Sequence, residues 1–461
     1  MDDAVGNTCG CIAEGPDFED VAFDRGLACM LAPALRMLYS TDGIATALFF
    51  TNKLVLEFVS DEDAIKPLCR FLAQDKLQHG GYEPLFLEPD ADLAAVFSAC
   101  VESIGFKPVI AAVRGLGCFA LGNTLEAAEQ AKILFLDAVK IAACAKASGD
   151  ADLVPDRFAT LAARSRESWQ RLRSASPANG ASGASGRGRL AGRIAIVTGG
   201  AQGFGKGIAE SLASEGAYIA VADLNFEGAA ACASQLNAAH SRQLAIAVAV
   251  DVSDEESVEH MVQETVLAFG GLDVLVSNAG VLVAGGLSDM SKEKFDFVTR
   301  VNYTGYFLCT KFASEPMKIQ NKYAPGYLTD IIEINSKSGL EGSKKNFAYA
   351  GSKFGGIGLT QSFALELVEY GIKVNAVCPG NLLDGSLWSD PERGLFRQYL
   401  DSGKVAGAKT IDDVRKFYEA KVPMKRGCNI TDVARAIIYI IEQKYETGQA
   451  VPVTGGQIML R

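Results

Sequence analysis

Tyr349 and Lys353 have the side-chain types and the spacing needed to move a proton at an alcohol carbon. Oxidising a secondary alcohol removes the hydroxyl proton as the hydride leaves, so a general base must lie within hydrogen-bonding distance. A free phenol titrates near pH ~10, and a neighbouring positive charge favours its ionised form. Lys353 lies one turn beyond Tyr349 on the same face of an expected helix and can supply that charge. We therefore predict that Tyr349 is the acid and base of a hydride-transfer reaction, and that Ser336 anchors the substrate oxygen.

A glycine-rich turn at 198–205 follows an apolar run and opens into the expected helix 206–214. Its glycines let the backbone approach a pyrophosphate, and the helix N-terminus offers free N–H groups. Asp223 ends the next expected strand, where a carboxylate can bind the hydroxyls of the adenosine ribose. A 2′-phosphate would be repelled there, and neither Gln202 nor Leu224 supplies an offsetting cation. The pattern favours NAD over NADP; the alternative for Asp223 is a solvated carboxylate.

Apolar runs that alternate with amphipathic segments must position these residues. Such alternation predicts an α/β fold with a doubly wound parallel sheet of the Rossmann type, in which ligands bind beyond the carboxyl ends of the strands. The candidate residues fall at those ends. The expected strands are 194–198, 218–222, 245–250, 274–277, 331–335, 373–378 and 450–453.

The chain divides at residues 174–189, which are rich in Gly, Ala and Ser and predict a flexible linker. The linker separates an auxiliary domain at 1–173 from an oxidoreductase domain at 190–461. In the first part, the apolar runs 109–113 and 118–122 and the helical pattern 124–147 predict a smaller N-terminal α/β domain.

Composition excludes several classes of function. The net charge of −11 argues against a nucleic-acid partner. The three histidines, His79, His240 and His260, are far apart in sequence and predict no metal site. The eleven cysteines lack metal-like spacing apart from Cys9 and Cys11, and we interpret them as thiols. Without a membrane-length apolar stretch or a secretory signal, we expect a cytoplasmic protein with no membrane partner.

Residues 190–461 resemble the short-chain dehydrogenase/reductase family. The resemblance rests on the ordered set Thr198–Gly205, Asn278-Ala279-Gly280, Asn302, Ser336, Tyr349 with Lys353, and Pro379-Gly380. It implies that Asn302 is a fourth catalytic residue, which holds a water and the proton-relay path to the lysine, and that the protein forms a dimer or tetramer. The residues expected to bind the cofactor are Gly199, Gln202, Gly203, Phe204, Gly205, Asp223, Leu224, Asp251, Val252, Asn278, Ala279, Gly280, Tyr349, Lys353, Pro379 and Gly380.

Within that family the chain resembles the bacterial sorbitol-6-phosphate 2-dehydrogenases, on motifs that include 334–339, 342–346, 353–361, 422–428 and 453–457. That resemblance implies interconversion of D-sorbitol 6-phosphate and D-fructose 6-phosphate. Lys337, Lys344 and Lys345 are then candidate phosphate ligands, although surface lysines are the alternative. The segment 382–421 is expected to form a substrate lid, in which Trp388 either walls the substrate or packs the lid.

The stretch 115–143 resembles the C-terminal part of class II aldolase/adducin domains, including Gly122-Asn-Thr-Leu-Glu-Ala-Ala128. Those aldolases bind zinc through several histidines, whereas this part of the chain has only His79, so we predict a degenerate module for assembly or regulation. Two other functions stay open for the whole protein. One is a dehydrogenase of an unphosphorylated polyol or small aldehyde, and the other is a non-catalytic NAD-binding regulator.

Overall fold

The computed structural model of the chain describes residues 21–40, 43–60, 62, 84–105, 107–147, 188–392, 394–401, 403 and 405–459. The chain divides into two compact units. One comprises Arg187–Thr265 and Leu272–Arg461, and the described residues before Arg187 fall in the other. Most of the predicted linker, at 174–187, lies outside the described residues, as do His79, Cys9 and Cys11.

The larger unit is built on a sheet of seven strands that are all parallel, in the order β11-β10-β9-β8-β5-β6-β7. The direction of winding reverses between β5 and β8, and ligands of such sheets bind outside the carboxyl ends at that switch point. The central strands are buried throughout, as expected when helices cover both faces. The strands are β5 (Ile194–Thr198), β6 (Tyr218–Asp223), β7 (Ala245–Ala249), β8 (Val274–Ser277), β9 (Thr329–Ile334), β10 (Ile372–Pro379) and β11 (Ala450–Val453).

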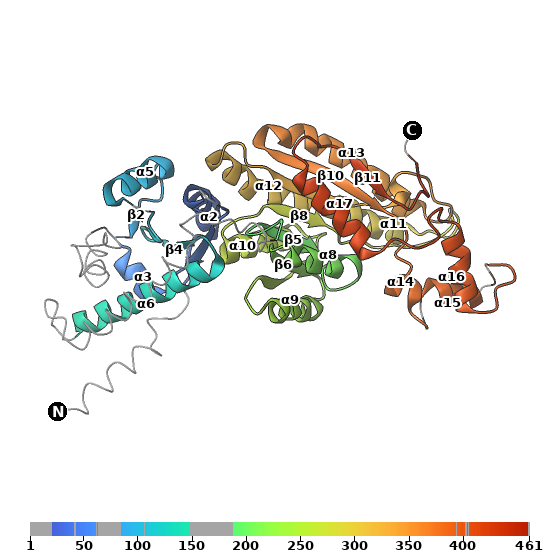
Figure 1. Cartoon of the computed structure of the whole chain (residues 1–461), viewed down its shortest axis with the longest axis horizontal. Helices are drawn as coiled ribbons and strands as arrows, with labels where there is room; N and C mark the ends of the chain where they lie inside the picture. The colour runs from blue at the N-terminus through green and yellow to red at the C-terminus, as the bar shows by residue number, and fades with distance from the viewer. Residues whose placement is uncertain are drawn as a thin grey trace, which may run out of the picture. The chain divides into compact units, whose positions relative to one another are not determined.

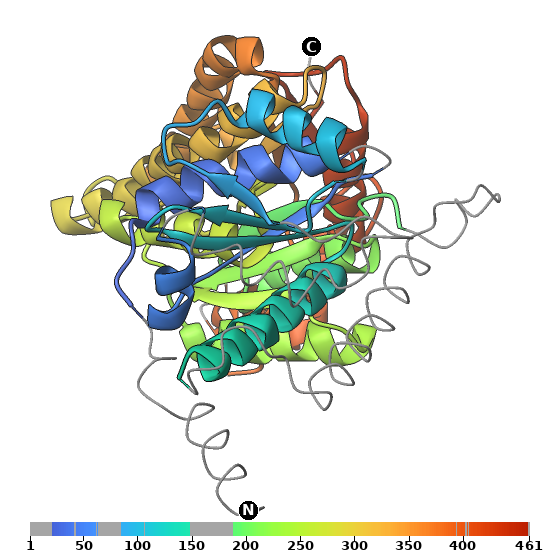
Figure 2. The ribbon, with the colours of Figure 1, turned by 90° about the vertical axis from the view of Figure 1, so that its left-hand side faces the viewer.

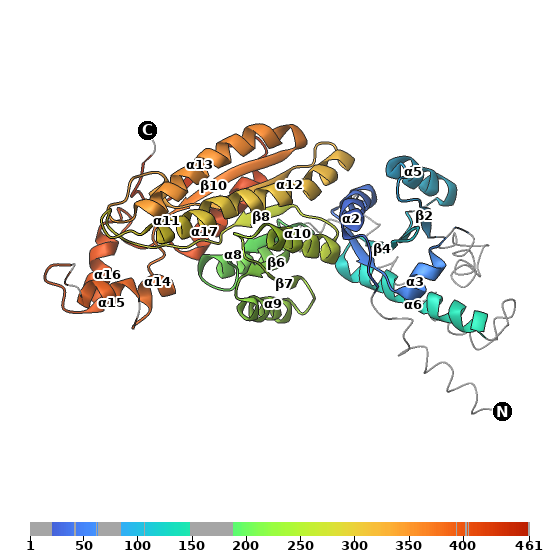
Figure 3. The same ribbon diagram turned by 180° about the vertical axis from the view of Figure 1, so that it is seen from behind.

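Helices cover both faces of this sheet. Helices α8 and α17 lie side by side over one face, and α12 and α13 pack together over the other (Figures 1 and 3). Gly207 permits the first contact, because a Cβ there would lie 2.4 Å from Ile430 Cγ2. The helices are α8 (Gly203–Ser214), α9 (Phe226–His240), α10 (Glu255–Phe269), α11 (Lys292–Thr299), α12 (Gly305–Tyr323), α13 (Phe347–Leu367) and α17 (Ile430–Glu442), with 3₁₀ turns at η3 (Lys337–Gly339) and η4 (Val368–Tyr370).

The expected lid segment forms a small helical cluster with its own apolar interior. It contains α14 (Ser386–Ser389), α15 (Leu395–Asp401) and α16 (Ile411–Ala420). Trp388 is buried there, with its ring centroid 5.3 Å from that of Phe396 and 5.0 Å from that of Tyr418. Trp388 therefore packs the interior of this segment, which is one of the two roles considered for it.

The smaller unit is a mixed sheet of four strands in the order β1-β4-β3-β2. Strand β4 is antiparallel to both β1 and β3, and β2 is parallel to β3. Helix α6 lies along one face of the sheet, and α2 and α5 lie on the other (Figure 2). Phe50, Phe135 and Val139 belong to the core between the sheet and α6. The elements are α2 (Arg25–Tyr39), β1 (Thr46–Phe50), α3 (Lys53–Phe58), β2 (Leu85–Leu87), α5 (Leu93–Ile104), β3 (Ile110–Val113), β4 (Gly117–Gly122) and α6 (Leu125–Ala147).

The structure confirms the predicted α/β class with a parallel Rossmann-type sheet and a smaller N-terminal sheet. The bounds predicted for one strand, 331–335, differ from the structure, in which β9 begins at Thr329 and ends at Ile334. Among the described helices, none has the combination of length and apolar character that crossing a membrane requires. Within the same residues, no group of three or more His, Cys, Asp or Glu side chains is placed to hold a metal ion.

Candidate active site

The glycine-rich turn is folded tightly at the end of β5. Gly199 and Gly203 have positive φ values of 64° and 58°, which glycine adopts without strain. A Cβ at Gly205 would lie 2.0 Å from the Gly199 carbonyl oxygen, so the turn leaves no room for a side chain there. Helix α8 begins at Gly203, and the side chain of its N-cap residue, Gln202, makes no capping hydrogen bond. The first N–H groups of α8 are thus left for an anionic group, as a pyrophosphate requires.

Asn278 holds this turn in place from the end of β8. Its Nδ2 donates to the carbonyl oxygens of Thr198 at 2.8 Å and Gly199 at 3.2 Å. The backbone N–H groups of Asn278 and Ala279 both donate to Thr198 Oγ1 at 3.0 Å. The amide of Asn278 therefore braces the two strand ends at the switch point, and the small residues Ala279 and Gly280 continue the chain past them.

Asp223 lies beside the turn at the end of β6. Its Oδ2 accepts from the Ala201 N–H and its Oδ1 from the Asn225 N–H, both at 2.9 Å. Each oxygen keeps a further lone pair, which suits a ribose hydroxyl donor. Leu224 is 76% exposed and carries no charge. Farther along the sheet, the Asp251 carboxylate binds Ser253, and Val252 is buried.

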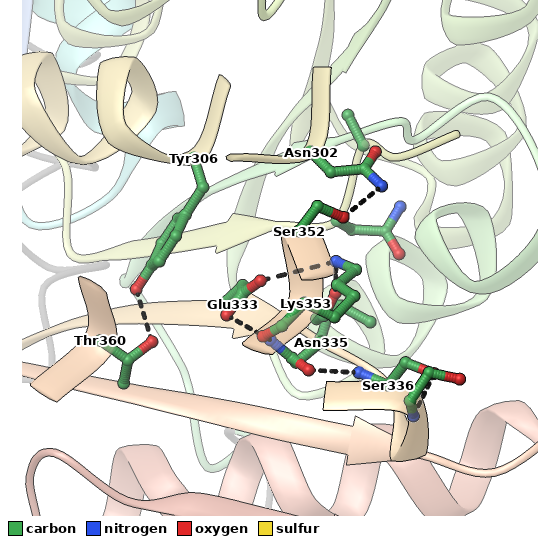
Figure 4. Close-up of polar contacts among 12 residues, drawn as sticks. Asn302, Tyr306, Glu333, Asn335, Ser336, Ser352, Lys353 and Thr360 are labelled. Carbon is green, nitrogen blue, oxygen red and sulfur yellow. Dashed lines mark hydrogen bonds and ion pairs between the residues drawn. The ribbon is translucent and has the colours of Figure 1, made fainter. Parts of the chain in front are cut away.

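Two of the predicted catalytic residues, Ser336 beyond β9 and Lys353 on α13, lie in one cluster with Asn302 (Figure 4), and Tyr349 lies earlier on α13. Ser336 follows β9, and its Oγ accepts from the Ser338 N–H at 3.1 Å, which caps the turn η3. Tyr349 is half-buried in the first turn of α13. Lys353 lies on the same helix with only 4% of its surface exposed, and its Nζ donates to the Ile334 carbonyl oxygen at 2.7 Å. Packing thus brings the end of β9 against the helix that carries the Tyr–Lys pair.

Asn302 lies in a π-helical segment, Arg300–Thr304, which continues into α12. Short π-helical stretches are frequent at functional sites. The Asn302 amide donates to the Val281 carbonyl oxygen at 2.9 Å and to Ser352 Oγ at 3.1 Å. Its Oδ1 accepts from the Val281 N–H at 2.8 Å. The side chain thus joins α12 to the loop after β8 and to the residue that precedes Lys353.

Glu333 and Asn335 also belong to this cluster, although the sequence argument did not select them. Asn335 Nδ2 donates to Glu333 Oε2 and to the Lys353 carbonyl oxygen, both at 2.8 Å. Glu333 Oε1 lies 3.5 Å from Lys353 Nζ. A sequence signal was available, because Glu333 interrupts an otherwise apolar run in a strand expected to be buried.

The candidate phosphate ligands lie in two environments. Lys344 and Lys345 are exposed on a turn before α13, where Lys345 has a positive φ of 60°. Lys337 is half-buried directly after Ser336, and its Nζ lies 3.5 Å from Gln457 Oε1. Burial lowers the pKa of the Lys337 ammonium, Glu341 opposes this effect, and the ammonium of Lys421 lowers the pKa further. Lys421, at the end of α16, therefore lies near enough to Lys337 for the two cations to repel each other, and the sequence argument missed it.

Pro379 ends β10, and Gly380 follows it at the same edge of the sheet. The Gly380 N–H donates to the Val453 carbonyl oxygen at 2.9 Å, and a Cβ at Gly380 would lie 3.4 Å from Gln457 Oε1. The C-terminal segment that carries Gln457 is thus held next to Lys337 and the end of β10.

Comparison with known proteins agrees with this architecture. Residues 193–389 match the family described as short chain dehydrogenase. The chain is 40% identical to the sorbitol-6-phosphate 2-dehydrogenase of Escherichia coli over 58% of this chain and 99% of that protein. It is 31% identical to a sorbitol dehydrogenase of Cereibacter sphaeroides over 59% of this chain and 99% of the relative. The crystal structure of sorbitol-6-phosphate 2-dehydrogenase from Erwinia amylovora superposes with a TM-score of 0.53 at 40% identity, and the match covers 58% of this chain and all of that one.

The chain therefore belongs to the short-chain dehydrogenase/reductase family, whose members are oxidoreductases that act on CH–OH groups with NAD or NADP. Its family resemblance lies in the larger unit.

Proposed function

We propose that the protein interconverts D-sorbitol 6-phosphate and D-fructose 6-phosphate with NAD. In the oxidising direction, Tyr349 takes the hydroxyl proton while the hydride leaves the same carbon, so the alcohol becomes a ketone. Bound NAD supplies the acceptor for that hydride. Ser336 holds the substrate oxygen, and the Lys353 ammonium favours the ionised phenol. We propose that Asn302 positions the α13 helix end and the water-mediated proton path, in keeping with its contacts to Val281 and Ser352.

The observation that carries the substrate proposal is the placement of Lys337. It directly follows the residue that would hold the substrate oxygen, and it is half-buried. The Glu341 carboxylate and, less strongly, the Lys421 ammonium both act on its charge. Two ammonium groups that repel each other gain most from an anion placed between them. A phosphate at the far end of an open-chain substrate is such an anion. The relatives named sorbitol-6-phosphate 2-dehydrogenase support the same substrate.

Replacing Lys337 with Met is expected to lower kcat/KM for sorbitol 6-phosphate roughly 10- to 100-fold, since a hydrogen bond to a charged group contributes about 1.5–3 kcal/mol. Activity is measured from NADH absorbance over a series of substrate concentrations. Lys344→Met, which changes an exposed lysine before α13, is the matched control and should alter kcat/KM by less than about two-fold. Equal losses in both variants, or a larger loss in Lys344→Met, would assign the phosphate to the exposed turn.

The cofactor proposal rests on the Asp223 carboxylate. In the double variant Asp223→Asn with Leu224→Arg, a repulsive charge is removed and a cation is added, so the ratio of NADP to NAD activity should rise by at least about 10- to 100-fold. Michaelis constants for both dinucleotides test this. Asp251→Asn removes the same charge at the end of the neighbouring strand β7 and should leave the ratio unchanged. A wild-type protein that already prefers NADP would contradict the proposal outright.

A dehydrogenase of an unphosphorylated polyol is the second candidate, favoured by the similarity to a sorbitol dehydrogenase. Sorbitol and sorbitol 6-phosphate offered at equal concentrations separate the two, because only the second gains from Lys337. If the protein turns over neither polyols nor small aldehydes with NAD or NADP, the non-catalytic NAD-binding regulator is the candidate that remains.

We further propose that residues 1–173 form an auxiliary, class II aldolase-like domain for assembly or regulation, joined by the linker 174–189. A cytoplasmic homo-oligomer fits two observations. Five buried cysteines, Cys118, Cys232, Cys309, Cys378 and Cys428, are free thiols, as in a reducing compartment. Helices α12 and α13 expose the apolar side chains Phe307, Phe354 and Leu365, the last of them 83% exposed.

A further inference from the structure

Glu333 is a buried carboxylate within the Tyr–Lys cluster. Only 1% of its surface is exposed, yet it lies near the end of β9, in direct contact with the helix that carries Lys353. One oxygen, Oε2, accepts from Asn335 at 2.8 Å. The other, Oε1, has the Lys353 ammonium at 3.5 Å as its charged partner and accepts no conventional hydrogen bond from the described residues. A buried carboxylate is costly unless it is paired, so its presence here needs a reason.

Helix α13 leaves room for this carboxylate at Gly356. A Cβ at that position would lie 2.3 Å from Glu333 Oε1. The ammonium of Lys353, one turn earlier, also donates to the Ile334 carbonyl oxygen at 2.7 Å. Figure 4 shows the carboxylate between the Lys353 ammonium and the Asn335 amide. The fold therefore fixes both the ammonium and the charge that partly offsets it.

Other titratable groups face Glu333 from the neighbouring elements. Tyr306 on α12 is buried and bonds to Thr360, and burial followed by the Glu333 charge raises the pKa of its phenol. Cys378 on β10 is buried, and the same two causes raise the pKa of its thiol. On Glu333 itself, burial raises the pKa, while Lys353 and Asn335 oppose that effect. Helix α17, which also packs on this sheet, buries only apolar residues. Lys353 is therefore the cation that pairs with Glu333.

We propose that Glu333 is a positioning residue that fixes the Lys353 ammonium against β9 and reduces the positive field that reaches Tyr349. This inference rests on the proposed role of the Tyr–Lys pair. A carboxylate close to the ammonium makes the phenolate less favourable, so the phenol keeps its proton to a higher pH. A protonated phenol is the form that donates a proton during ketone reduction, and Glu333 thus favours reduction at neutral pH.

The sign of the expected change follows from Coulomb's law. Glu333→Gln removes the negative charge and keeps the volume, so the Tyr349 phenolate should form at lower pH. At an effective dielectric constant of about 20, a unit charge roughly 12 Å from a titrating group shifts its pKa by about one unit, so we expect a shift on the order of one pH unit. The limb of the pH–rate profile for alcohol oxidation that rises with pH should move downward by the same amount.

The direct test is an ultraviolet titration of phenolate absorbance with NAD bound. Each protein is compared with its own Tyr349→Phe counterpart, so that the difference isolates Tyr349 and removes the signals of the other tyrosines, Tyr306 included. We expect the midpoint in Glu333→Gln to lie about one pH unit below that of the wild type. Glu333→Asp retains the charge and should restore the wild-type midpoint to within about 0.3 pH units, whatever its effect on the rate.

If Glu333→Gln does not fold, Gly356→Ala tests the inference instead. Its methyl group would push the Glu333 carboxylate away from Lys353, while residue 333 itself remains glutamate. Its matched control on the same helix is Gly358→Ala, where a Cβ meets nothing within 4 Å. We expect the titration midpoint of Tyr349 to be lowered in Gly356→Ala and to be unchanged in Gly358→Ala.

An unchanged midpoint in a folded Glu333→Gln protein, or in Gly356→Ala when that variant decides, would overturn the inference. The titration needs no substrate, so it separates this inference from the proposed function. A lowered midpoint in a protein that oxidises no polyol would support the role of Glu333 and reject the proposed reaction. Turnover of sorbitol 6-phosphate with an unchanged midpoint in Glu333→Gln would support the proposed reaction and reject the role of Glu333.

Discussion

Tyr349→Phe is expected to lower kcat roughly 10²- to 10⁴-fold in both directions of the reaction, which is the usual contribution of a general acid–base group. The phenyl ring keeps the volume and the helix contacts of the half-buried residue, while the proton carrier is lost. Turnover is followed by NADH absorbance, and NADH binding by fluorescence. Binding should stay within about three-fold of the wild type, because the loss lies in the transition state rather than in the ground state.

Tyr439→Phe is a suitable control for that experiment. It removes a phenol hydroxyl from the exposed face of α17, where the group donates to Glu446, and should leave kcat unchanged. A Tyr349→Phe enzyme with more than about a tenth of wild-type turnover would show that the proton is transferred by another group. The assignment of the whole cluster would then have to be abandoned.

Gly205→Ala is expected to weaken NAD binding at least about 100-fold. The new Cβ would lie 2.0 Å from the Gly199 carbonyl oxygen and 2.6 Å from Asn278 Nδ2. The first atom belongs to the turn proposed to receive the pyrophosphate. The second is the side-chain amide that holds this turn through the Thr198 and Gly199 carbonyl oxygens, so neither atom can move aside without disturbing the turn. We therefore expect the turn to open, with a loss of about 1–3 kcal/mol in the free energy of unfolding. Calorimetric titration with NAD and denaturant unfolding measure the two effects.

Gly358→Ala supplies the comparison for Gly205→Ala. It places the same methyl group on an exposed helical position with no neighbour, and replacing glycine there should keep NAD affinity and add up to about 1 kcal/mol of stability. If Gly205→Ala bound NAD with wild-type affinity, the turn after β5 would not be the pyrophosphate site.

The amino-acid sequence predicted the parallel sheet because local patterns encode it. Each buried strand is a short apolar run, and each crossover helix has an amphipathic repeat, so the seven strands could be located from periodicity. Their parallel order then placed the turn after β5, Asp223, Ser336 and Gly380 at one edge without any knowledge of contacts. The sequence was less informative about the first part of the chain, where short strands with no strong motif left only a class of fold.

Tertiary structure decided which of the polar residues act on one another. Sequence spacing placed Lys353 one turn from Tyr349, but it gave no sign that Glu333, on a strand, would lie 3.5 Å from the same ammonium. It also did not distinguish the half-buried Lys337, beside Gln457 and near Lys421, from the exposed Lys344 and Lys345. The physical reason is that periodicity is a property of neighbours along the chain, whereas burial and charge pairing depend on residues that meet only when separate elements pack together.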